Sequence, residues 1–289
     1  MTIAIEQLVS VVYCADEHDY RQKRCGLSLA NQLLISLESL RTNWSKLVDV
    51  YLFHTAPLTQ KLSDQLQALK VKPISVNGPL QSGFPLANKI LVGAGYSGSK
   101  DILFLDCDTR IYRPPVFDTN REIAVSFDAL QAVSYETYRD FFGFLKLPMP
   151  SGEVFPDPAF QYYRRGISNQ FPQFNSGVYF LKKCQQTPFY VEWQRLFRKA
   201  HAHFAGSTWE FYLEQLSFAA AILSLKLDVG LFPPGINFIC TPRAPYLKDW
   251  PQEDIIIEHY AGDTSQPLVF VSGHIDPVAS GLTPMPACL

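Results

Sequence analysis

The sequence predicts an α/β fold with a central, mostly parallel sheet flanked by helices. Short continuous apolar runs, typical of strands buried on both faces, alternate with helical stretches along the chain. The first run is residues 8–14, LVSVVYC, and a later one, residues 102–105, ILFL, ends in two acids. Strands that alternate with helices are typical of parallel sheets, in which helices cover both faces.

Composition places the chain among globular proteins. Of its 289 residues, 47% are hydrophobic and 18% are charged, and the formal net charge is −2. This apolar content is enough for a sizeable core and excludes a largely disordered chain. Because there is no basic block, the charge pattern argues against a nucleic-acid partner and against binding to an anionic membrane surface.

The sequence shows neither a targeting signal nor a cysteine framework. The N-terminal stretch lacks a basic region followed by an apolar core and a cleavage site, and the longest apolar stretch, around residues 216–225, is too short to span a bilayer. The six cysteines are scattered without a C-x-x-C pair, which fits neither a disulfide framework nor a zinc site. We therefore expect a cytoplasmic protein without a transmembrane segment.

The first half of the chain is expected to alternate regularly. Its strands are runs of apolar and β-branched residues, and its helices show apolar residues three or four positions apart, as in the stretch from Leu27 to Leu40. In chain order we expect a strand at 8–14, a helix at 27–40, a strand at 48–54, a helix at 59–69, a strand at 71–76, a helix at 85–92 and a strand at 102–105.

The second half is less regular. A helix is expected to begin at Thr187-Pro188, because proline is favoured at the first helical position, and another at Ser207, because Glu210 would complete a capping box. No linker divides the chain, so we expect one domain over residues 1–289. The remaining expectations are strands at 124–127, 178–181 and 255–260 and an ordered loop over 147–174 that is rich in proline, glycine and aromatic residues.

Two acids follow the strand at 102–105. Because side chains alternate along a strand, Asp106 and Asp108 should point the same way and Cys107 the opposite way. Open α/β sheets bind ligands at the carboxyl ends of their strands, and two neighbouring carboxylates repel each other unless a cation lies between them. This Asp-x-Asp motif indicates a divalent metal site, or else a pair of solvated acids that cap the loop.

His259 is a candidate third ligand. Alternation places it on the same face of the last strand as Ile255 and Ile257, so it is either a core histidine or a ligand. If it meets Asp106 and Asp108 in space, two oxygens and one nitrogen would suit Mn²⁺ or Mg²⁺.

Two further polar groups have a structural and a functional interpretation. The Asn175-Ser176-Gly177 segment is either a turn before the strand at 178–181, or a place where the backbone at Gly177 approaches a ligand whose hydroxyls contact Asn175. Glu214 and Gln215 lie in a helix of apolar character, where a buried amide needs a partner. Either the side chain is hydrogen-bonded to the backbone at the helix edge, or Glu214 and Gln215 are a carboxylate–amide pair that faces a sugar.

Residues 93–98 spell the glycine pattern of a dinucleotide-binding loop. That pattern should be followed by a helix, whereas here an apolar run typical of a strand follows. We therefore interpret it as a glycine-rich connection between a helix and a strand.

Taken as a set, these segments resemble those of the GT-A-fold glycosyltransferases. The similarity is greatest to the group that includes glycogenin and the bacterial lipopolysaccharide galactosyltransferases, glycosyltransferase family 8. The segments occur in the family's order and span nearly the whole chain: VVYCADEHDY at 11–20, ANKILVGAG at 87–95, DILFLDCDTRIY at 101–112, FNSGVYFLKK at 174–183, FYLEQLSFAAAI at 211–222 and IEHYAG at 257–262.

The resemblance implies a hexosyltransferase that moves a sugar from a nucleotide-diphosphate donor, with UDP-sugars favoured, to an acceptor hydroxyl on a glycan, a lipid or a small molecule. It implies metal dependence and retention at the anomeric carbon. The implied positions are Ala15, Asp16 and Tyr20 near the nucleoside; Lys89 near the diphosphate or the acidic pair; Asp106, Asp108 and His259 on the metal; Asn175, Gly177, Glu214 and Gln215 along the sugar side, with Asn175, Glu214 and Gln215 the candidate catalytic residues; and Gly262 near phosphate.

The sequence also departs from the family. A Lys-Pro-Trp signature usually follows the histidine segment, and Gln266-Pro267-Leu268 stands there instead. The missing lysine motivates one alternative, a protein that binds nucleotide sugars without transferring them. A second alternative is a phosphatase with Asp106 as nucleophile, although the motif lies far along the chain and Arg110 replaces the usual threonine or valine.

Overall fold

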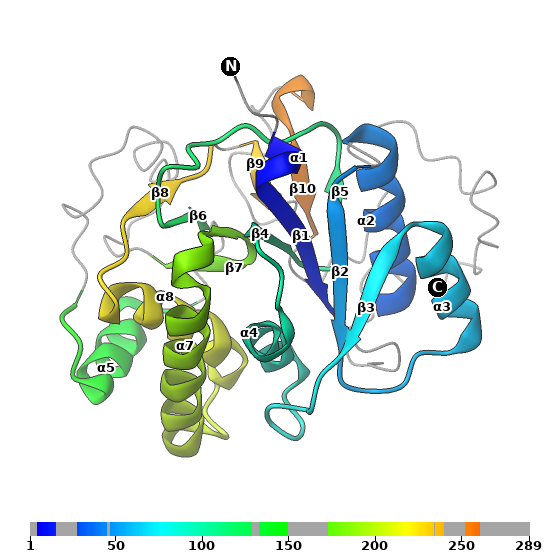
Figure 1. Cartoon of the computed structure of the whole chain (residues 1–289). Coiled ribbons are helices and arrows are strands. Elements are labelled where there is room, and N and C mark those ends of the chain that lie inside the picture. The colour runs from blue at the N-terminus through cyan, green and yellow to red at the C-terminus, as the bar shows by residue number, and fades with distance from the viewer. Residues whose placement is uncertain are drawn as a thin grey trace, which may run out of the picture.

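The computed structural model describes residues 5–15, 28–44, 47–128, 133–149, 173–233, 235–239 and 252–260. Its larger sheet consists of β1 (Val9–Cys14), β2 (Asp49–His54), β3 (Val71–Ser75), β4 (Asp101–Leu105), β6 (Ile123–Phe127), β7 (Phe174–Leu181) and β8 (Val229–Leu231). The strand order is β3-β2-β1-β4-β7-β6-β8 (Figure 1). Neighbouring strands are parallel except at β7, which is antiparallel to β4 and β6. The predicted mostly parallel sheet is confirmed.

The helices cover both faces of this sheet (Figure 1). They are α1 (Ile5–Leu8), α2 (Leu29–Asn43), α3 (Gln60–Ala68), α4 (Val92–Gly95), α5 (Tyr135–Leu145), α7 (Lys183–Phe204) and α8 (Leu213–Ser224), with short 3₁₀ turns η2 (Pro85–Leu91), η4 (Glu210–Tyr212) and η6 (Gln252–Asp254). None of the helices in the described ranges combines the length and the apolar character that a membrane crossing requires.

Burial on both faces explains why the sequences of the central strands are continuous apolar runs. On β1, Val9, Val11 and Tyr13 pack with leucines of α2 and α3, while Val12 belongs to the core on the other face, with residues of α7 and α8. A strand covered by helices on both sides has no solvent-facing positions, so its sequence shows no polar alternation. The apolar runs were therefore sufficient to locate the central strands.

Both predicted helix starts in the second half are wrong. Helix α7 begins at Lys183 and contains Pro188, whose missing N–H removes one hydrogen bond near the start of a long helix. Helix α8 begins at Leu213, after a 3₁₀ turn. The capping box does not form, because the Glu210 carboxylate accepts a hydrogen bond from the Gly206 N–H and the Ser207 hydroxyl has no partner among the described residues.

The expectation that residues 93–98 form a connection is only partly correct, because the first three of them belong to the short helix α4. Tight packing explains the first glycine. A Cβ on Gly93 would lie 2.2 Å from the Cβ of Tyr190, so only glycine lets α4 approach α7 this closely. The segment then leads into β4, as the strand-like run predicted.

A second, three-stranded sheet brings the distant last strand to the end of β4. It contains β5 (Thr109–Ile111), β10 (Ile257–His259) and β9 (Ile236–Ile239), in the order β5-β10-β9. Strand β10 is antiparallel to β5, and His259 lies opposite Thr109. Strand β5 directly follows the acidic pair, so this pairing carries His259 to the two acids.

Candidate metal centre

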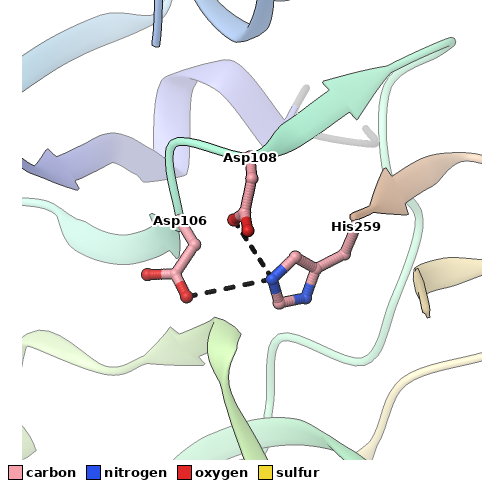
Figure 2. A group of neighbouring side chains, drawn as sticks. All are labelled: Asp106, Asp108 and His259. Carbon is pink, nitrogen blue, oxygen red and sulfur yellow. Dashed lines mark ion pairs between the residues drawn. The ribbon is translucent and has the colours of Figure 1, made fainter. Parts of the chain in front are cut away.

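The three predicted metal ligands meet in space (Figure 2). The Nε2 atom of His259 lies 3.3 Å from Oδ1 of Asp108 and 3.9 Å from Oδ2 of Asp106. One ligand atom from each residue lies within 4.8 Å of the others, which is close enough for a common ion. Two carboxylates and an imidazole provide the hard oxygen and borderline nitrogen donors that suit Mn²⁺ or Mg²⁺.

The acids face the centre for a different reason from the one predicted. Strand β4 ends at Leu105, so strand alternation does not orient them. Asp106 donates its N–H to the carbonyl of Gly177 at 2.7 Å, and its own carbonyl accepts from the Thr109 hydroxyl at 2.8 Å. The Cys107 thiol points away, toward the carbonyl of Cys14. The expected orientations are correct, but a tight turn produces them.

A chain of side-chain amides fixes the orientation of the His259 ring. The backbone N–H of Gly177 donates to Oδ1 of Asn175 at 2.9 Å, which identifies that atom as an acceptor. Asn237 donates its Nδ2 to the same atom at 3.1 Å, so its own Oδ1 faces Nδ1 of His259, at 2.8 Å. Nδ1 therefore donates to Asn237, and Nε2 is the ring nitrogen that faces the carboxylates. A histidine held through one nitrogen in this way can offer the other to a metal ion.

Gly177 leaves room for the centre. A Cβ at this position would lie 2.2 Å from Cε1 of His259 and 2.8 Å from Oδ2 of Asp106. The backbone at Gly177 therefore comes close to two of the candidate metal ligands, while the expected approach to a bound sugar stays a prediction. The interpretation of residues 174–177 as a turn is wrong, since they belong to β7. The irregular register of β7 against β6 after Val125 explains how a strand residue reaches this position.

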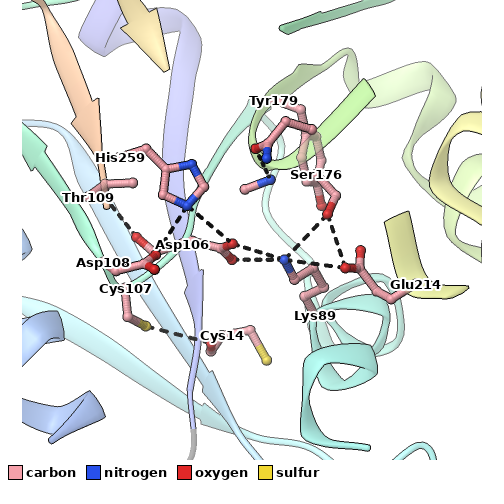
Figure 3. A network of polar contacts seen from close by, with 12 residues as sticks. Cys14, Lys89, Asp106, Cys107, Asp108, Thr109, Ser176, Tyr179, Glu214 and His259 are labelled. Atoms are coloured by element: carbon pink, nitrogen blue, oxygen red, sulfur yellow. Dashed lines mark hydrogen bonds and ion pairs between the residues drawn. The ribbon is translucent and has the colours of Figure 1, made fainter. Parts of the chain in front are cut away.

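Lys89 joins the acidic pair to Glu214 (Figure 3). Its Nζ lies 3.0 Å from Asp106 and 3.7 Å from Oε2 of Glu214. The Ser176 hydroxyl donates to the same Glu214 oxygen at 3.1 Å, while Oε1 of Glu214 has no partner among the described residues. Burial alone would lower the pKa of Lys89, but the carboxylates of Asp106 and Glu214 outweigh it and raise that pKa, so the lysine is charged. Of the two places that the resemblance implied for Lys89, the structure shows the contact with the acidic pair, and its role toward a diphosphate stays a prediction.

At this site, burial opposes the ionisation of the Glu214 carboxyl. Burial raises the pKa of Glu214 from 4.5 to about 7, against the opposing effect of Lys89. The folded protein therefore binds a proton that the unfolded chain releases. The resulting stabilisation is complete below about pH 4.5 and is lost as the pH rises through about 7.

We expect Glu214→Gln to remove this pH dependence. Chemical denaturation from pH 4.5 to pH 8 should show a smaller decline in the free energy of unfolding for the variant than for the wild type. The matched control is Glu136→Gln, which neutralises an exposed acid of α5 and should keep the wild-type decline. Equal declines in the wild type and in Glu214→Gln would contradict the assignment.

Gln215 finds a side-chain partner that the sequence did not suggest. Its Nε2 donates to Oδ2 of Asp128 at 2.7 Å, and Gln173 donates to the same oxygen at 3.4 Å. The Gln215 amide nitrogen therefore bonds to a side chain, and the expected hydrogen bond to the backbone at the helix edge is not observed. Asp128 could have been found, because it directly follows the buried strand β6 just as Asp106 follows β4.

Of the other expected site residues, Ala15 and Asn175 lie in the described part of the chain. Ala15 is buried at the end of β1 and donates its N–H to the carbonyl of Phe53 at 3.0 Å. Asn175 lies in the amide chain described above. No local signal pointed to Asn237, whose importance depends on its contact with His259. Asp16, Tyr20, Gly262 and the segment 266–268 lie outside the described residues.

Comparisons with known proteins identify the fold. No protein-family model and no curated protein sequence matches the chain. Among solved structures, the chain has the fold of glycosyltransferases of the GT-A class, as the sequence segments predicted. A particular example is the galactosyltransferase LgtC with donor and acceptor sugar analogues, with TM-score 0.56 and 14% identity over 96% of this chain and 97% of that one.

Two other solved structures show the same likeness. The glycosyltransferase GlyE of Streptococcus pneumoniae matches with TM-score 0.54 and 13% identity, over 88% of this chain and 54% of that one. Mouse xyloside xylosyltransferase 1 matches with TM-score 0.51 and 14% identity, over 90% of this chain and 99% of that one.

Proposed function

We propose that this protein is a glycosyltransferase that transfers a hexose from a nucleotide-diphosphate sugar, with a UDP-sugar favoured, to an acceptor hydroxyl. The observation that carries the proposal is the Nε2 atom of His259 facing two carboxylates, at the end of a central strand in a GT-A fold. Asp106, Asp108 and His259 would hold Mn²⁺ or Mg²⁺. When bound, the cation would stabilise the negative charge that develops on the diphosphate leaving group.

The chain's own residues would do the remaining work. The charged Lys89 lies against Asp106 and is available to a diphosphate oxygen that approaches the acids. Glu214 lies on the side of Lys89 away from Asp106, and the next residue, Gln215, is paired with Asp128. These three groups would offer a carboxyl, an amide and a carboxylate to sugar hydroxyls. Asn175 would contribute through His259. Contacts with the nucleotide are still predicted for Ala15, Asp16, Tyr20 and Gly262. Retention at the anomeric carbon, a single domain and a cytoplasmic location are predictions as well.

A thermal-shift screen tests the proposal. The protein is melted with UDP-galactose, UDP-glucose and other UDP- and GDP-sugars, each with and without Mn²⁺, and the release of nucleoside diphosphate is measured in parallel. A ligand that binds the folded state raises the melting temperature by mass action. We expect a UDP-sugar to do so only with Mn²⁺, and UDP to be released slowly.

Two outcomes point elsewhere. Metal-dependent binding without UDP release, with and without acceptor sugars, would favour the non-catalytic alternative, which the Gln266-Pro267-Leu268 segment motivates. The absence of binding by any nucleotide sugar would contradict the proposal. The phosphatase alternative receives no support from the similar structures described above, which are glycosyltransferases.

A further inference from the structure

Helix α2 holds β5 through polar side chains on one of its faces. Ser36, Ser39 and Asn43 are spaced three and four residues apart, so they lie along one side of the helix. The Ser36 hydroxyl contacts that of Thr109 at 2.9 Å, Ser39 accepts from the N–H of Ile111 at 3.0 Å, and Asn43 donates to the carbonyl of Ile111 at 2.8 Å. These contacts position both ends of the strand that follows the acidic pair.

Three hydroxyls in this region form a chain with one direction. Thr109 donates to the carbonyl of Asp106, which can only accept, so the Thr109 oxygen must accept from Ser36. The proton of Ser36 is then used, so Ser36 accepts from the hydroxyl of Tyr13, at 2.9 Å. The order is Tyr13 to Ser36 to Thr109 to the Asp106 carbonyl, and the last step is drawn in Figure 3.

The chain is buried in apolar surroundings. Tyr13, Ser36 and Thr109 are at most 2% exposed. Burial raises the pKa of Tyr13, so its phenol keeps its proton and can donate. Buried hydroxyls that are fully paired add little net stability over apolar side chains of the same shape, but they restrict geometry and polarise one another. The main effect of these three hydroxyls is therefore to fix the orientation of the backbone to which they bind.

The turn held by these hydroxyls carries two of the candidate ligands and is paired with the strand that carries the third. The Asp106 carbonyl accepts the last hydroxyl, Asp108 directly precedes Thr109, and His259 lies opposite Thr109 in the β5–β10 pair. A shift of Thr109 would displace all three ligands relative to one another.

We propose that Tyr13, Ser36 and Thr109 are positioning residues that set the geometry of the Asp106–Asp108–His259 cation site from the opposite side of the turn. The inference rests on the proposed function, because it assumes that the site binds a cation. None of the three touches the ion or the substrate; each acts through the backbone of the acidic turn.

The test is Mn²⁺ binding by the whole protein, without any turnover, followed by the electron paramagnetic resonance signal of the free ion. Thr109→Val keeps the shape of the side chain and removes its hydroxyl. We expect it to bind Mn²⁺ about tenfold more weakly, since groups that orient metal ligands typically contribute 10- to 100-fold to affinity. Thr109→Ser restores the hydroxyl and should bind like the wild type. Tyr13→Phe should weaken binding less, because it removes the remote end of the chain.

The matched control is Tyr190→Phe. It removes an equally buried hydroxyl, which pairs with that of Tyr179 at 2.8 Å on the other face of the sheet, and it should lower the melting temperature without changing Mn²⁺ affinity. Wild-type affinity in both Thr109→Val and Tyr13→Phe would overturn the inference, and so would equal weakening in Tyr190→Phe. Failure of the wild-type protein itself to bind Mn²⁺ would instead overturn the proposed function together with the inference.

Discussion

The Asp108→Asn protein is expected to lose Mn²⁺-dependent binding of UDP by at least about 100-fold, because changes to groups outside the ligand set already reduce metal affinity 10- to 100-fold. The substitution keeps the size of the side chain and removes one anionic ligand 3.3 Å from Nε2 of His259. Isothermal titration calorimetry with UDP, with and without Mn²⁺, measures the effect. Transfer activity should fall with binding.

The fold should survive this change. The carboxylates of Asp106 and Asp108 belong to a cluster within 4.8 Å, where like charges repel when no cation is bound. The melting temperature of Asp108→Asn without metal should therefore equal or exceed that of the wild type. Asp64→Asn removes the same charge from an exposed position of α3 and should bind UDP normally. Unchanged UDP affinity in Asp108→Asn would disprove the metal assignment.

Gly177→Ala is expected to have the second largest effect, on both binding and stability. The new Cβ would need the space of the His259 ring, 2.2 Å away, and would approach the Asp106 carboxylate at 2.8 Å. Relief of such overlap displaces the ligands and typically lowers stability by about 1–3 kcal/mol. We expect Mn²⁺ affinity to fall by roughly 10-fold or more, as for other changes that misplace metal ligands. Metal titration and chemical denaturation measure the two effects.

The control for this variant is Gly143→Ala in helix α5. A Cβ there meets nothing within 4 Å, and alanine favours the helix over glycine by about 0.5–1 kcal/mol. The same substitution should thus stabilise the protein at Gly143 and destabilise it at Gly177. A Gly177→Ala protein with wild-type Mn²⁺ affinity would show that the close approach has no role in the site.

The local sequence was a good guide where burial on both faces left an unbroken apolar pattern. The strands β1, β2 and β4 lie close to their predicted positions, because both of their faces are buried. Strand β3 also lies where it was predicted, although it is an edge strand whose residues are mostly exposed. The local sequence was a poor guide to the start of α7, since proline is tolerated near a helix start as well as at its first position. Strand β5 and helix α5 were not predicted at all.

The candidate site shows the same division. Asp106 and Asp108 could be selected because two acids end a buried strand, and Asp128 could have been selected by the same rule. His259 could be named as a candidate but not assigned, since its partners are joined to it only by the pairing of β5 with β10. Nothing in the residues around Asn237 indicated that its amide would face an imidazole.

The amino-acid sequence by itself determined the alternating α/β architecture and the acids at the end of β4, because these depend on patterns within a few neighbouring residues. The tertiary structure decided that Nε2 of His259 faces those acids, that Gly177 must lack a side chain, and that Lys89 connects the acidic pair to Glu214. These features join residues far apart in the chain, and distances between such residues are fixed only when the sheets pair and the core packs.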